Sequence, residues 1–113
     1  MGMFLVTYIN TRLVAMTFFD FVEKYCEKYQ LKLVATDEGK RLAGIRLISI
    51  KLLVYIIRVY FNSPSYQIIA NSLTISRQSA MLFYYDILSK AMYRKIAEDR
   101  YKEIMNAKTT RII

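Results

Sequence analysis

The sequence contains no histidine, no tryptophan, one cysteine and one proline among its 113 residues. Without histidine, and with Cys26 as the single thiol, the chain lacks the side chains that zinc sites and Cys/His catalytic pairs require. A single cysteine cannot form an internal disulfide, which is typical of proteins of the reducing cytosol. We therefore expect a cytoplasmic protein that holds neither a metal ion nor a cofactor.

Glycine and proline, the residues that mark turns and linkers, are scarce as well. The chain has three glycines and one proline, whereas hydrophobic residues make up 55% of it. A chain of this length can bury a core without disulfides or metal ions. We predict one all-α domain over residues 1–113, folded as a small helical bundle.

The groups that enzymes use are also missing. The chain has no Gly-rich phosphate loop and no Walker-type lysine. Acidic residues do recur at helical spacing between residues 20 and 27, but Lys24 and Lys28 alternate with them. That alternation is typical of a solvated helix face rather than of a carboxylate pair for acid/base chemistry. The sequence predicts neither an enzyme nor a small-molecule substrate.

No segment has the pattern of a signal peptide or a membrane span. The apolar residues 3–6 have no basic residue before them, and Arg12 interrupts the apolar stretch after them. The longer apolar run, residues 42–61, contains Arg46, Lys51 and Arg58. Charged side chains of this kind are costly inside a bilayer. We therefore predict a soluble protein that does not bind membranes.

The most informative pattern lies between residues 65 and 83. Small Ala70 is placed where two helix backbones must approach, and Ser76 is a good N-cap for a second helix. Pro64 suits the first position of the preceding helix, with Ser63 as its N-cap. The pattern predicts a helix-turn-helix at about 64–89, with helices at about 64–72 and 77–89. Its apolar positions are Ile69, Leu73, Ile75, Ala80 and Phe83.

Helical periodicity extends to both sides of this motif. We predict a helix over residues 18–29, with Thr17 as its N-cap and Cys26 buried on its apolar face. Residues 36–61 form the predicted central helix. A long C-terminal helical extension over about 90–106 either continues the motif or follows a kink near Ser89, and residues 107–113 are predicted to fray. Residues 3–14 fit a strand or a short helix, with the helix weakly favoured.

The net charge of +8 predicts a polyanionic partner. Residues 62–89 have no net charge, whereas residues 37–61 carry +3 and residues 90–113 carry +4. This distribution favours phosphate contacts on both sides of a base-reading element, although a solvated basic surface explains the charge equally well.

We therefore predict that the partner is double-stranded DNA, with the second helix of the motif in the major groove. Arg77 could pair with guanine, Gln78 with adenine, and Met81 could touch a thymine methyl group. The predicted base-reading residues are Ser76, Arg77, Gln78, Ser79, Met81 and Tyr85; Tyr84 and Tyr85 could exchange their inward and outward roles. The predicted phosphate contacts are Lys40, Arg41, Arg46, Ser65, Lys90 and Arg94.

About two thirds of the chain resembles the C-terminal DNA-binding domain of the bacterial replication initiator DnaA. That family has a Tyr-Leu-x-Arg helix, a Ser-initiated helix with Ile-Gly/Ala, and an Asp-His-Thr-Thr-Val signature. Residues 55–58 correspond to the first element, Ser65 with residues 69–70 to the second, and residues 77–81 to the signature. Arg77 and Gln78 stand where the family has Asp-His. The resemblance implies a free-standing helix-turn-helix with its own DNA target and a role in replication or transcription, without the family's ATPase domain.

Two other functions stay open. A protein-interaction module could keep the same fold and bind a partner through Met81, Leu82 and Tyr85. An amphipathic protein of the membrane surface has only the basic extension in its favour. Helix-turn-helix proteins also often act as homodimers, and residues 91–106 or 3–14 could supply such an interface.

Overall fold

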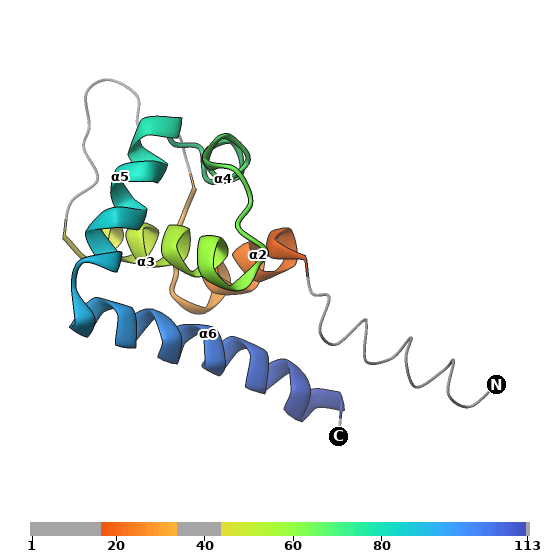
Figure 1. Cartoon of the computed structure of the whole chain (residues 1–113). Helices are drawn as coiled ribbons and strands as arrows, with labels where there is room; N and C mark the ends of the chain where they lie inside the picture. Colours follow the sequence, from red (N-terminus) through yellow and green to blue (C-terminus); the bar gives the residue numbers. More distant parts are fainter. Residues whose placement is uncertain (1–16, 34–43, 113) are drawn as a thin grey trace.

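The chain is described by a computed structural model over residues 17–33 and 44–112 (Figure 1). Within these residues it forms helices and no strand, so the prediction of an all-α fold is confirmed for this part of the chain. The helices are α2 (Phe18–Lys28), α3 (Gly44–Tyr60), α4 (Tyr66–Leu73), α5 (Arg77–Leu88) and α6 (Ala91–Ile112). The predicted helix start near Thr36, the basic residues Lys40 and Arg41, and the whole segment 3–14 lie outside the described residues.

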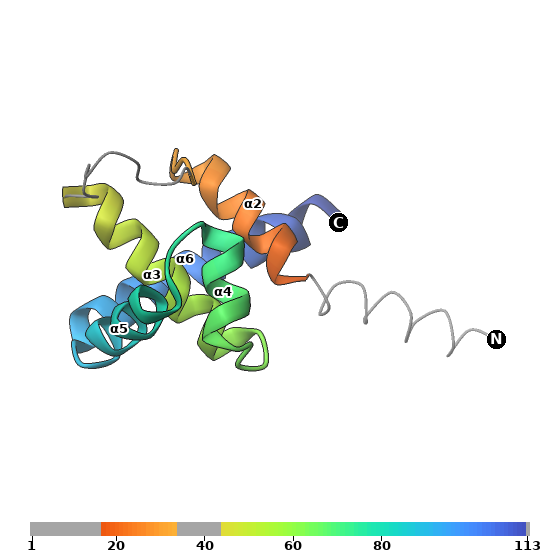
Figure 2. The same ribbon diagram turned by 90° about the horizontal axis from the view of Figure 1, so that it is seen from above.

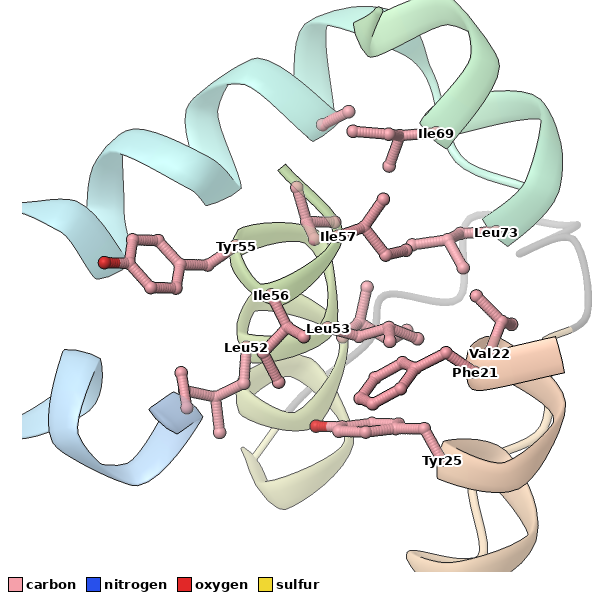
Figure 3. Close-up of a cluster of buried hydrophobic side chains, with 14 of the residues drawn as sticks. Phe21, Val22, Tyr25, Leu52, Leu53, Tyr55, Ile56, Ile57, Ile69 and Leu73 are labelled. Carbon is pink, nitrogen blue, oxygen red and sulfur yellow. The ribbon is translucent and has the colours of Figure 1, made fainter. Parts of the chain in front are cut away.

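Helix α3 lies at the centre of the fold in both views of the molecule (Figures 1 and 2). It contacts α2, α5 and α6. Five of its residues, Leu52, Leu53, Val54, Ile56 and Ile57, have no exposed surface. A helix buried at consecutive positions is covered on all sides by other elements. Figure 3 shows Leu52, Leu53 and Ile56 in the apolar cluster at the centre of the fold. The prediction that this helix is the buried one is therefore confirmed.

Helix α2 begins where the sequence predicts, because Thr17 caps it. The Thr17 Oγ1 accepts a hydrogen bond of 3.2 Å from the backbone N–H of Asp20, which satisfies one of the free donors at a helix start. Phe21 and Tyr25 are fully buried on the inner side of α2. Cys26 is only half-buried, so the prediction of a buried cysteine is too strong: its side chain lies at the edge of the apolar stripe.

A buried polar network joins α2, α3 and α6. The Tyr25 hydroxyl donates a hydrogen bond of 2.7 Å to the Ser49 carbonyl oxygen. Arg100 Nη1 in turn donates to the Tyr25 hydroxyl oxygen at 2.7 Å and to the Ser49 hydroxyl at 3.1 Å. The Arg100 guanidinium also lies 4.2 Å from the centre of the Tyr29 ring. The network fixes α2 and the middle of α6 against the same turn of α3.

Alkaline pH should destabilise the fold through this network. Burial raises the pKa of Tyr25 from 10.0 to about 12, and the nearby Arg100 guanidinium only partly opposes that shift. In the unfolded chain the hydroxyl ionises near its ordinary value, so above about pH 10 the folded state retains a proton that the unfolded state has lost. This contribution is complete below about pH 10 and is lost as the pH rises toward 12.

Urea unfolding of the chain at a series of pH values measures this loss. The free energy of unfolding of the wild-type chain should fall above about pH 10, and that of Tyr25→Phe should fall less steeply, because phenylalanine does not ionise. Equal pH dependence of the two proteins would show that Tyr25 does not contribute.

The predicted start of α4 is wrong by two residues. Ser65, rather than Ser63, is the N-cap, and its Oγ accepts a hydrogen bond of 3.2 Å from the Ile68 N–H. Ser63 has a left-handed backbone with a φ of 48°, and its hydroxyl donates to the Arg58 carbonyl oxygen. Arg58 Nη1 also donates to the Pro64 carbonyl oxygen at 2.7 Å. These contacts hold Pro64 in the connection between α3 and α4, outside the helix.

Helices α5 and α6 are separate, which agrees with the predicted kink near Ser89. The break lies at Ser89 and Lys90, where the Ser89 hydroxyl donates to the Asp86 carbonyl oxygen. The predicted end at residue 106 is wrong, because the backbone is helical to Ile112. Across the described residues, no helix combines the length and hydrophobicity that crossing a bilayer requires.

Candidate functional site

The candidate site is built on α4 and α5, which pack against each other across a short connection at residues 74–76. Ala70 of α4 and Ala80 of α5 are both fully buried, as expected of small residues where two helices approach closely. Thr74 ends α4 in the left-handed conformation with a φ of 58°. That conformation is uncommon for a β-branched residue, and the turn contains no glycine to relieve it.

Ser76 forms the predicted N-cap of α5. Its Oγ accepts a hydrogen bond of 3.0 Å from the Ser79 N–H and donates one of 2.9 Å to the Ser79 hydroxyl. Ser79 itself is half-buried. Both predicted base-reading serines therefore have a local structural function, which is to fix the exposed first turn of α5.

Replacing Ser76 with alanine should lower the free energy of unfolding by about 1 kcal/mol, because the Ser79 N–H then loses its acceptor. Ser76→Asp should restore most of that loss, since a carboxylate accepts the same hydrogen bond and favours a helix N-terminus. Thermal and urea unfolding of the three proteins provide the comparison. An alanine variant as stable as the wild-type chain would contradict the capping role.

Four other predicted base-reading residues share the solvent-facing side of α5. Arg77 and Gln78 are exposed in its first turn, and Met81 and Tyr85 are 38% and 54% exposed further along. The opposite side, with Ala80 and Ile87, is buried. The arrangement follows from the helical period, because positions three or four apart lie on one face.

The alternative placement of Tyr84 and Tyr85 is resolved by the aromatic contacts. The Tyr84 ring stacks on Tyr55 of α3, with ring centres 5.7 Å apart, and it is half-buried. Tyr85 faces solvent and meets the Tyr84 ring edge-on at 5.2 Å. The Arg58 guanidinium lies 4.4 Å from the Tyr66 ring and 6.0 Å from the Tyr84 ring. Arg58 thus links α3, α4 and α5 behind the exposed face.

The predicted phosphate contacts have different environments. Arg46 is exposed on the first turn of α3, and Ser65 caps α4. Lys90 pairs with Asp86 at 2.8 Å, and Arg94 Nη1 donates a hydrogen bond to the Leu88 carbonyl oxygen. Both basic side chains therefore contact the end of α5. Lys40 and Arg41 are not among the described residues.

Asp86 is the feature of this region that is hardest to predict from the sequence. Its carboxylate accepts from Lys51 Nζ of α3 at 2.7 Å as well as from Lys90. The hydrogen bonds from Lys51 and then Lys90 hold the pKa of Asp86 below its ordinary value. Lys51 is half-buried in this contact. Its charge therefore serves to join α3 to α5.

Comparisons with family models, with curated proteins and with solved structures gave no significant match for this chain. The resemblance to the DNA-binding domain of the replication initiator rests on the sequence positions given above.

Proposed function

We propose that this protein binds double-stranded DNA in a sequence-specific manner, with α4, the connection at 74–76 and α5 acting as a helix-turn-helix. The observation that carries the proposal is the start of α5. A capped, solvent-facing helix end presents Arg77 and Gln78, while the other side of α5 packs on α3 and α4. A helix supported in this way can enter a major groove without rearrangement of the fold.

The base contacts follow from the chemistry of the first turns of α5. The Arg77 guanidinium matches the two acceptors of guanine, and the Gln78 amide matches the donor and acceptor of adenine. Met81 lies one turn beyond Arg77 and can contact a thymine methyl group. Tyr85 lies one further turn along, where its side chain, which is 54% exposed, can reach the edge of the site.

The charge of the chain supports binding to the DNA backbone. Residues 44–112 contain eleven Lys and Arg against four Asp and Glu, whereas α4 carries no charge. Affinity would come from basic residues such as Arg46, and from Lys90 and Arg94 once phosphate competes with their present partners. The cellular role in this proposal is control of replication or transcription.

Selection from a random duplex library tests the proposal and returns the binding site in one experiment. The expected result is an enriched motif that contains a guanine next to an adenine, as Arg77 and Gln78 require. Recovery of unenriched sequences, or of no duplex at all, would contradict sequence-specific reading.

A protein-interaction module is the second candidate, and a specific observation favours it. Beyond its first turn, the exposed face of α5 is apolar, with Leu82 and Tyr85 more than half exposed. Exposed apolar stripes of this kind are typical of protein contacts. In this case the α4–α5 unit would keep the helix-turn-helix fold without reading DNA.

A further inference from the structure

A continuous apolar stripe covers the solvent-facing side of α5 beyond its first turn. The α5 stripe consists of Met81, Leu82, Tyr85 and Leu88, with exposed fractions of 38%, 56%, 54% and 36%. Met81, Tyr85 and Leu88 are spaced by four and three residues, so they lie along one face of the helix, and Leu82 lies beside them. The core contact of this turn is made by Ile87, which is buried, whereas Leu88 is left at the surface.

Both ends of the α5 stripe are basic. Arg77 is exposed one turn before Met81, and at the other end Arg94 bonds to the Leu88 carbonyl oxygen beside Lys90. The single carboxylate of α5, Asp86, is paired with two lysines, and α4 has no charged residue. The surface is therefore apolar along its length and positive at its ends.

We propose that the α5 stripe binds an amphipathic helix of a partner protein whose apolar face is flanked by acidic side chains. Such a helix offers apolar anchors at helical spacing to the stripe and carboxylates to Arg77 and Arg94. A second copy of this chain fits less well, because it would bring two identical basic surfaces of a +8 protein together. A DNA duplex would leave Leu82 and Leu88 without apolar contacts, because its phosphates and sugars offer no apolar surface that could cover them.

This proposal does not depend on DNA binding by the chain. If the chain also binds DNA as proposed above, the two partners exclude each other, because Met81 and Tyr85 belong to both surfaces.

A designed peptide serves as the probe. The acidic peptide is a helix of about 20 residues with leucines on one face and glutamates on the other, and a matched basic peptide carries lysines in place of the glutamates. Fluorescence anisotropy with the full chain measures both affinities. The acidic peptide should bind saturably, and the basic peptide should bind at least about tenfold more weakly.

The decisive variant is Leu82→Gln, which removes an exposed apolar side chain without a change of charge. It should weaken binding of the acidic peptide by about tenfold. Phe19→Gln is its matched control, because Phe19 of α2 is 60% exposed and lies outside the stripe. This control should change the affinity by less than about twofold, and both variants should unfold at temperatures close to that of the wild-type chain.

Three results would overturn the proposal. The first is equal binding of the acidic and basic peptides, and the second is an equal loss of affinity in Leu82→Gln and Phe19→Gln. The third is a dimer in sedimentation experiments that Leu82→Gln dissociates, because the stripe would then be covered by a second copy.

Discussion

Replacing Ile56 with alanine should lower the free energy of unfolding by about 2–5 kcal/mol. Ile56 is fully buried in the central helix, where Figure 3 shows it beside Leu52 and Leu53. The alanine removes apolar contact and leaves a cavity, which the surrounding helices cannot fill without moving. Urea unfolding gives the result as a lower midpoint with an unchanged slope.

Val59→Ala is the control on the same helix. Val59 is 44% exposed and lies one turn beyond Tyr55, so its truncation should change the free energy of unfolding by no more than about 0.5 kcal/mol. A loss below about 1 kcal/mol for Ile56→Ala, or similar losses for the two variants, would contradict the position of α3 at the centre of the core.

The second large effect concerns recognition. Arg77→Ala should weaken binding to the selected duplex by about 1–3 kcal/mol and relax the preference at the guanine position. The Arg77 side chain is exposed in the first turn of α5, so its loss should leave stability almost unchanged. Anisotropy with the selected duplex and with duplexes altered at that position measures both effects.

Arg46→Ala is the comparison that separates base reading from backbone contact. Arg46 is exposed on α3 and is proposed to contact phosphate, so its loss should weaken binding to all duplexes equally and reduce the salt dependence. If Arg77→Ala also weakened all duplexes equally, Arg77 would be a phosphate contact and the proposed guanine contact would be wrong.

Local sequence signals predict much of the fold. Thr17 and Ser76 are identifiable as N-caps because the residue type and the apolar period after it are both local features. The buried helix is identifiable because apolar residues nearly surround its second half. The same reasoning correctly separates the exposed and buried sides of α5, since Ala80 is small and buried and lies roughly opposite the exposed Gln78.

The errors arise where contacts made by side chains outside the local pattern decide the structure. The sequence favours Ser63 as a cap because it precedes Pro64, but the Arg58 side chain binds the carbonyl groups of this connection and keeps both residues outside α4. No sequence pattern indicates the hydrogen bonds of Arg100, because its partners Tyr25 and Ser49 are 75 and 51 residues away from it along the chain. Pairings of this kind cannot be deduced from periodicity.

The candidate site is predictable in part for the same reason. The helical period alone places Arg77, Gln78, Met81 and Tyr85 on one exposed face. The pairing of Asp86 with Lys51, by contrast, depends on how α3 crosses α5. The site residues thus follow from the sequence, whereas their electrostatic surroundings follow from the fold.

The most direct test of DNA binding is a duplex titration of the full chain at about 50 mM and about 200 mM salt. Binding driven by phosphate contacts releases counterions, so the affinity should fall at least about tenfold between the two conditions. The selected duplex should also bind more tightly than a scrambled duplex at both salt concentrations. Absence of binding at the lower salt concentration, or an affinity that salt does not change, would contradict the proposed function.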